Sequence, residues 1–69
     1  SLGYRKVSLV DQRLIIHTKT PVEIHIKDIK GEVITRKHNV SFDYEDKTYN
    51  LLVKDPMLIL HAIGYIKEK

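Results

Sequence analysis

The chain has no cysteine among its 69 residues. Disulfide bonds are therefore excluded, and no zinc-ligand spacing replaces them. A domain of this length buries only about 60% of the surface that its unfolded chain exposes, so hydrophobic packing must stabilise it, with help from a second subunit or a larger protein. We expect one domain, residues 1–69, and the start at Ser1 instead of methionine is compatible with a fragment of a longer protein.

Long hydrophobic runs are missing as well. The longest is residues 57–60, whereas a membrane-spanning helix needs roughly 20 apolar residues, and the first residues have no signal-peptide pattern. Together with the absent cysteines, this predicts a cytoplasmic protein whose membrane contact would be peripheral. Twelve basic against nine acidic residues give a net charge of +3 with the signs mixed along the chain. The basic cluster at residues 36–38 is therefore expected to be a solvated turn.

Catalytic motifs are also lacking: there is no nucleophile triad, glycine-rich phosphate loop or cofactor fingerprint. Three carboxylates lie close together in the sequence, namely Asp43, Glu45 and Asp46. Acid–base catalysis needs such a group desolvated in a cleft, whereas these fall on a strand's outer face and its turn. His17 and His25 would share an outer strand face beside Glu23, in a spacing typical of no zinc site. We expect no enzyme, no metal, no cofactor and no small-molecule substrate.

The sequence does contain an abrupt change of hydrophobic period. Apolar residues alternate from Val7 to Val53, most clearly in residues 22–26, which predicts half-buried strands. The predicted strands are residues 6–10, 13–17, 22–26, 32–36, 40–44 and 48–53. Short turns separate them, and Gly31 supplies a position where positive φ is permitted.

A helix is predicted after Val53. Asp55 is suited to the N-cap, and Pro56 to the first helical position, where no useful hydrogen-bond donor is lost. A broad apolar stripe is expected to cover the sheet, made of Leu58, Ile59, Ala62, Ile63, Tyr65 and Ile66. The fold class is therefore mainly β (α+β): a small antiparallel curled sheet or partial barrel of about six strands, capped by one C-terminal helix.

Two segments and the order of elements resemble the pleckstrin-homology superfold, particularly its small bacterial and archaeal PH-like and GRAM-like domains. Residues 7–16, VSLVDQRLII, resemble the opening "apolar strand, Thr-Asp-x-Arg-Leu, apolar strand", with Val10 in the place of threonine. Residues 22–29, VEIHIKDI, resemble the third strand "Ile-Pro-Leu-x-x-Ile", with His25 in the place of proline. The superfold has seven strands, so the missing strand would begin around residues 2–5 or lie outside this chain.

Members of this superfold bind phosphoinositides, peptides or protein partners, and some archaeal relatives are adaptor domains. The leading hypothesis is accordingly a non-catalytic interaction or adaptor domain that binds a protein partner, or a second copy of itself, through its sheet and helix. Apolar side chains at positions that the strand and helix periodicity assigns to a solvent-exposed face indicate such an interface. These residues are Ile15, Ile34, Leu52, Met57 and Leu60.

Two alternatives remain open. The first is binding of an anionic lipid or phosphate through the basic residues of the first strands, which are Arg5, Lys6, Arg13, Lys19 and Lys27. A register that sets Arg13 opposite Lys27 would place two cations side by side and favour an anion between them. The second is a small barrel that binds RNA. Nucleic acid is disfavoured as a partner, because Tyr44 and Tyr49 are needed inside and leave no exposed aromatic platform.

Overall fold

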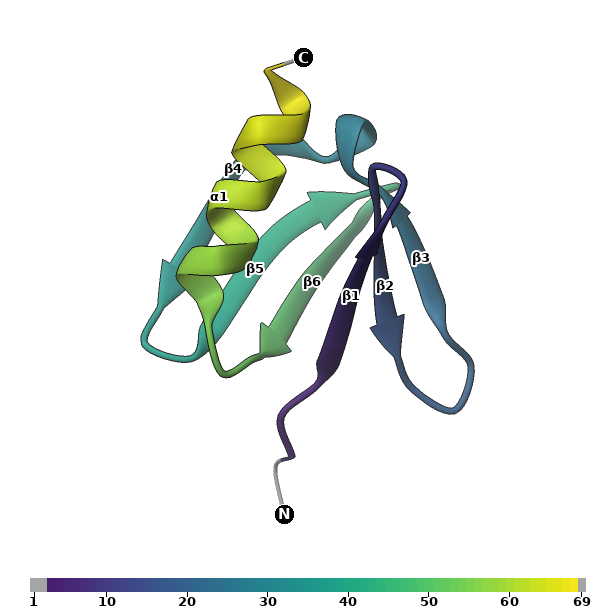
Figure 1. The fold of residues 1–69 in the computed structure, drawn as a ribbon, viewed down its shortest axis with the longest axis vertical. Coiled ribbons are helices and arrows are strands. Elements are labelled where there is room, and N and C mark those ends of the chain that lie inside the picture. Colours follow the sequence, from purple (N-terminus) through teal and green to yellow (C-terminus); the bar gives the residue numbers. More distant parts are fainter. Residues whose placement is uncertain (1–2, 69) are drawn as a thin grey trace.

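The computed structural model describes residues 3–68, which form six strands and a C-terminal helix (Figure 1). The elements are β1 (Lys6–Val10), β2 (Arg13–His17), β3 (Val22–His25), the short 3₁₀ helix η1 (Ile26–Asp28), β4 (Lys30–Arg36), β5 (Asn39–Tyr44), β6 (Lys47–Leu52) and α1 (Pro56–Lys67). The predicted number of strands and the closing helix are confirmed. No seventh strand forms at Gly3–Arg5, and Leu2, where that strand was expected to begin, lies outside the described residues.

The strands form two antiparallel three-stranded sheets, β1-β2-β3 and β4-β5-β6 (Figure 1). The strands of the predicted curled sheet or partial barrel are therefore divided between two sheets, which do not close into a barrel. Closure of a barrel needs an unbroken ladder of paired strands, but the chain leaves the first sheet at Ile26, where η1 begins. At the other junction, Arg5 donates its backbone N–H to Leu52 O at 2.7 Å, and within residues 3–68 no further backbone hydrogen bond joins β1 to β6.

Two hairpins are closed by turns with left-handed backbone. Asp11 and Gln12 have φ of 48° and 64°, and Glu45 and Asp46 have φ of 49° and 63°. Positive φ at both central residues is the geometry of a type I′ turn, whose twist matches that of the paired strands. These two-residue turns fix the β1–β2 and β5–β6 registers, and with them the faces on which alternate side chains lie.

The fourth strand is longer than predicted and bulged. It begins at Lys30 instead of Glu32, and its register against β5 shifts between Lys30 and Ile34. Gly31 has φ of 69° inside this irregular part. Glycine adopts this conformation more readily than residues that have a Cβ atom, so the bulge favours glycine at this position.

The core lies between the two sheets and is closed on one side by α1. Its buried side chains come from every element except β1 and β4: Leu14, Ile16, Ile24, Ile26, Ile29, Val40, Phe42, Tyr44, Leu51, Val53, Ile59 and Ile63. The Phe42 and Tyr49 rings stack with centroids 5.4 Å apart. The sheets are also linked by the N–H of His25, which donates to the Tyr44 hydroxyl at 3.2 Å. One apolar core therefore holds both sheets and the helix together.

The start of α1 is as predicted, but its buried face is narrower. Leu58 N donates to the N-cap carboxylate of Asp55 at 3.2 Å, and Ile59 and Ile63 are buried. Leu58 and Tyr65, which were expected to cover the sheet, are 64% and 63% exposed. The helix lies over the β4–β5 side of its sheet (Figure 1), and the first sheet covers the rest of the core. Only a narrow apolar stripe of α1 is therefore needed to complete the core.

Candidate functional site

A basic hollow lies where the N-terminal segment, the start of β1 and the loop between β6 and α1 meet. It measures about 330 Å³ and is lined by Tyr4, Arg5, Lys6 and Lys54. The hydrogen bond from Arg5 N to Leu52 O holds the N-terminal segment against the end of β6. Three cationic side chains therefore border one surface depression, and no carboxylate is among the residues that line it.

Contacts made by the rings of Tyr4 and His38 fix the residues that line the basic hollow. The Lys54 ammonium lies 5.9 Å from the centre of the Tyr4 ring, and this ring meets His38 edge-on, with centroids 5.6 Å apart. His38 Nδ1 is 3.3 Å from Lys54 O, a hydrogen bond that His38 donates in the tautomer with its proton on Nδ1. Val53 N also donates to His38 O at 2.7 Å. These contacts join the N-terminal segment to the β4–β5 turn and the β6–α1 loop. Together the three segments position the residues that line the basic hollow.

The cations of the basic hollow are not neutralised by ion pairs. Within residues 3–68 every carboxylate–cation pair closer than 4.0 Å involves Arg13 or His25. Asp55 lines an adjoining hollow with Arg5 and Lys54, but one of its oxygens caps α1. Unpaired cations that share a surface repel one another, and a bound anion relieves this repulsion through charge-assisted hydrogen bonds.

The same end of the molecule carries further positive charge. Figure 1 shows the N-terminal segment, the β4–β5 turn, the β2–β3 turn and the β6–α1 loop at this end. The predicted solvated cluster Arg36, Lys37 and His38 spans the β4–β5 turn, and Lys19 is in the β2–β3 turn. The hollow therefore belongs to a wider basic end of the molecule.

Arg13 and Lys27 do not form the predicted pair of cations. In the β2–β3 register Arg13 is opposite His25, because β3 ends there and Lys27 falls in η1. Arg13 Nη1 instead donates to Glu23 Oε1 at 2.7 Å, and its Nη2 is 3.9 Å from Asp11. The prediction of this juxtaposition is wrong, and Arg13 is already paired with carboxylates.

Of the five basic residues predicted to bind anions, the structure brings only Arg5 and Lys6 to the basic hollow. Lys19, like Arg13 and Lys27, does not line it. Sequence reasoning missed Lys54, since it is 48 residues from Lys6 and only the tertiary fold joins them. Its place in the short loop between β6 and the helix, next to the N-cap Asp55, was the one available signal.

The contact between Arg13 and Glu23 leads to a prediction about the titration of the Glu23 carboxyl group. The hydrogen bond from Arg13, together with its positive charge, lowers the pKa of Glu23, and the same contact raises the pKa of Arg13. In Arg13→Gln, the pKa of Glu23 should rise toward its ordinary value, which an NMR titration of its side-chain carboxyl measures. Arg36→Gln serves as control and should leave it unchanged.

The sign of the accompanying stability change follows from linkage. Because the native pKa of Glu23 is lowered, its contribution to stability is present above the ordinary glutamate pKa and is lost as the pH falls through the native value. The difference in stability between wild type and Arg13→Gln should therefore shrink in acid. A Glu23 midpoint that does not move in Arg13→Gln would contradict the assignment.

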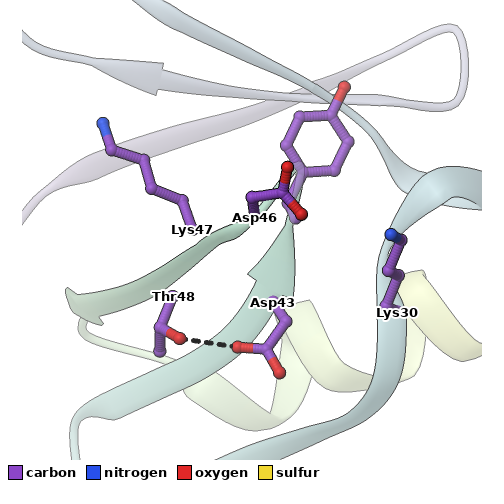
Figure 2. Close-up of a pocket in the computed structure, with 6 residues that line it drawn as sticks. Lys30, Asp43, Asp46, Lys47 and Thr48 are labelled. Atoms are coloured by element: carbon purple, nitrogen blue, oxygen red, sulfur yellow. Dashed lines mark hydrogen bonds between the residues drawn. The ribbon is translucent and has the colours of Figure 1, made fainter.

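A second hollow, of about 300 Å³, lies beside the β5–β6 turn and has mixed charge (Figure 2). Its lining residues are Lys30, Asp43, Tyr44, Asp46, Lys47 and Thr48. Figure 2 shows Lys30 and Lys47 on opposite sides of the two carboxylates, and Thr48 Oγ1 donates to Asp43 Oδ1 at 2.7 Å. Asp43, Glu45 and Asp46 are all exposed. With two lysines and two aspartates, this hollow has no preference for a ligand of either sign.

The histidines on the first sheet have partners of their own. His17 Nε2 is hydrogen-bonded to Ser8 Oγ at 2.8 Å, and His25 Nε2 is 3.7 Å from Glu23 Oε1. His25 is opposite Arg13 at one end of β2, while His17 is at the other end. Across residues 3–68 no three histidine, aspartate or glutamate side chains are grouped so that they could hold a metal ion.

The five residues predicted to form a protein interface lie on three surfaces. Ile15, half-buried, is on the outer face of the first sheet. Ile34, which is 53% exposed, and Leu52, half-buried, are on the outer face of the second. Met57 is 48% exposed on α1, and Leu60 is half-buried. They do not form one patch, whereas α1 exposes two apolar side chains, at positions 58 and 65, that the prediction had placed inside.

Comparison of the chain with protein-family models, curated proteins and solved structures gives no significant match. The pleckstrin-homology resemblance therefore stays a prediction that depends on the order of elements and two short motifs. Among the described residues, no helix combines the length and hydropathy needed to cross a bilayer.

Proposed function

We propose that this chain is a non-catalytic binding domain and that its basic hollow binds a phosphate-bearing anion. The observation that carries the proposal is the convergence of Arg5, Lys6 and Lys54 on one hollow without a lining carboxylate. Phosphate is the ligand chemistry of choice, since it spreads charge over several oxygens that can each accept a hydrogen bond.

The three cations are suited to different parts of this task. The guanidinium of Arg5 can donate to two phosphate oxygens at once, whereas Lys6 and Lys54 act as compact point charges. A volume of about 330 Å³ is at the lower end of small-ligand pockets. The hollow therefore suits a phosphate or a phosphorylated headgroup, with the rest of the ligand outside it.

A two-part titration tests the proposal and separates free phosphate from lipid as the source. Pyrophosphate is added to isotope-labelled protein at low salt, and vesicles of neutral lipid with or without a phosphoinositide are tested by flotation. We expect amide shifts at Arg5, Lys6 and Lys54 that fade with salt. Flotation only with acidic vesicles would identify a lipid headgroup. Absence of both shifts and flotation at low salt would overturn the proposal.

Protein binding through α1 is the second candidate function. The observation in its favour is that Met57, Leu58 and Tyr65 are 48%, 64% and 63% exposed on one helix. Exposed apolar side chains that gather on one element often mark an interface. Titration with a candidate adaptor partner should shift amides along the exposed side of α1, and shifts restricted to the basic hollow would exclude this mode for that partner.

RNA binding receives less support than either of these functions. Tyr44 is buried, and Tyr49 packs on Phe42 inside the fold. Tyr4 is the exposed ring beside the cations, whereas single-strand binding surfaces stack several successive bases on several rings.

A further inference from the structure

A smaller hollow adjoins the basic hollow and is mainly apolar. It measures about 160 Å³, and Arg5 and Lys54 line both hollows. The other residues that line it are Val7, Val53, Asp55, Leu58 and Ile59. The Asp55 carboxylate is the N-cap of α1, where it accepts a hydrogen bond from Leu58 N. The surface therefore changes from cationic to apolar across two adjoining depressions that share two cations.

Large apolar side chains are exposed beside these hollows. Leu58 is 64% exposed in the first turn of α1, and Tyr4 is 48% exposed at the basic hollow. Met57 is 48% exposed next to Leu58, and its Sδ is 3.8 Å from Oγ1 of Thr35, one residue before the end of β4. Exposed apolar side chains that gather in one region mark contact with a partner or a membrane.

Further cations surround these apolar side chains. Arg36 is the last residue of β4, Lys37 follows it in the β4–β5 turn, and Lys19 is in the β2–β3 turn. Figure 1 shows both turns at the same end of the molecule as the N-terminal segment and the start of α1. An anionic bilayer offers phosphate groups and, directly beneath them, hydrocarbon. This surface is therefore complementary to a bilayer in charge and in polarity.

We infer that this end of the molecule docks on an anionic lipid bilayer, with a lipid phosphate in the basic hollow and the Leu58 side chain inserted beside it. The inference rests on the proposed function and deepens it, because it names a membrane as the source of the phosphate. Tyr4 borders the basic hollow, a position that suits the preference of amphipathic tyrosine rings for the level of the lipid headgroups.

Such docking needs both the apolar side chain and the cations. Even a single acyl chain gives only marginal membrane binding, so stable attachment takes a second signal such as a basic patch. One leucine is a weaker anchor still. Each lysine or arginine near an anionic surface strengthens binding roughly fivefold. The cations therefore supply the attraction and the orientation, while Leu58 determines how deeply the molecule is seated.

Tryptophan fluorescence tests the insertion, since the chain has no tryptophan of its own. In Leu58→Trp we expect vesicles of phosphatidylcholine and phosphatidylserine to move the emission maximum to shorter wavelength, and brominated acyl chains to quench the emission. Pure phosphatidylcholine vesicles should have no effect. Tyr65→Trp is the matched control, because Tyr65 is 63% exposed on the same helix but about 10 Å farther along its axis. The emission of this variant should stay unchanged.

Vesicle flotation measures how much the insertion contributes. Leu58→Ala should weaken binding to the acidic vesicles roughly tenfold, whereas Tyr65→Ala should leave it unchanged. Neither position lines the basic hollow, so both variants should keep the wild-type affinity for pyrophosphate. Alanine is the best helix former, and circular dichroism should confirm that both variants retain the helix.

The possible outcomes separate this inference from the proposed function. Pyrophosphate binding without vesicle binding overturns the inference and leaves the proposed function in place, whereas absence of both overturns both. Vesicle binding that neither shifts the emission of Leu58→Trp nor weakens in Leu58→Ala overturns the insertion. Equal shifts in Leu58→Trp and Tyr65→Trp overturn the docking orientation. If a protein partner produces these shifts and vesicles do not, the inference fails in favour of protein binding through α1.

Discussion

Replacing Phe42 with alanine is expected to lower the free energy of unfolding by about 3–5 kcal/mol. Phe42 is 2% exposed in the middle of β5 and stacks on Tyr49, so its removal leaves a cavity that the rigid sheets cannot close. A 69-residue domain has a total stability of roughly 3–10 kcal/mol. The substitution should therefore abolish most of the fold's stability, as measured by urea denaturation followed by circular dichroism.

Two matched changes separate the packing effect from a general effect of substitution. Phe42→Leu keeps most of the volume and should cost less than the alanine variant. Ile34→Ala removes a large apolar side chain that is 53% exposed on the same sheet, so it should change stability by roughly 0.5 kcal/mol or less. If Phe42→Ala and Ile34→Ala had similar effects, the assignment of Phe42 to the core would be wrong.

Reversing the charge of Lys54 is expected to weaken pyrophosphate binding roughly tenfold to a hundredfold. A hydrogen bond to a charged group contributes about 1.5–3 kcal/mol, and Lys54→Glu also places a carboxylate beside the two remaining cations. The change is at an exposed loop position, so the protein should stay folded. The titration that tests the proposed function, repeated with this variant, gives the affinity ratio.

Lys19→Glu provides the control for net charge. It makes the same change at the same end of the molecule (Figure 1) but does not alter a residue that lines the basic hollow. Its effect should be small and should disappear as salt is raised, because only long-range attraction is lost. Equal losses in the two variants would indicate diffuse attraction to a basic surface without a defined site.

Most of the fold could be predicted from local sequence patterns, because these patterns reflect interactions between residues that are close together in the sequence. The alternation of Val40 and Phe42 with polar residues defines the buried face of β5, and the two-residue turn at Asp11 and Gln12 determines the first hairpin. The carboxylate of Asp55 specifies the start of α1 through one hydrogen bond. Each of these features depends on neighbours a few residues apart, and the sequence displays them directly.

Features that depend on distant parts of the chain were not predictable in this way. The exposure of Leu58 and Tyr65 depends on how much of the core the first sheet already covers, which helical periodicity does not reveal. The separation of the sheets depends on η1, a break that the alternating residues 22–26 conceal. Lys54 joins Arg5 and Lys6 only because β6 ends beside the N-terminal segment.

The uneven distribution of charge also affects how this molecule meets an anionic partner. The opposite end holds the β1–β2 turn, η1 and the β5–β6 turn, where Asp11, Asp28, Glu45 and Asp46 are offset by cations that include Arg13, Lys27 and Lys47 (Figure 1). The chain therefore has an electric dipole as well as a net charge of +3. In the field of a polyanion the molecule turns its basic end toward the polyanion during diffusion. The bimolecular rate constant for capture should consequently fall more steeply with ionic strength than the small net charge implies.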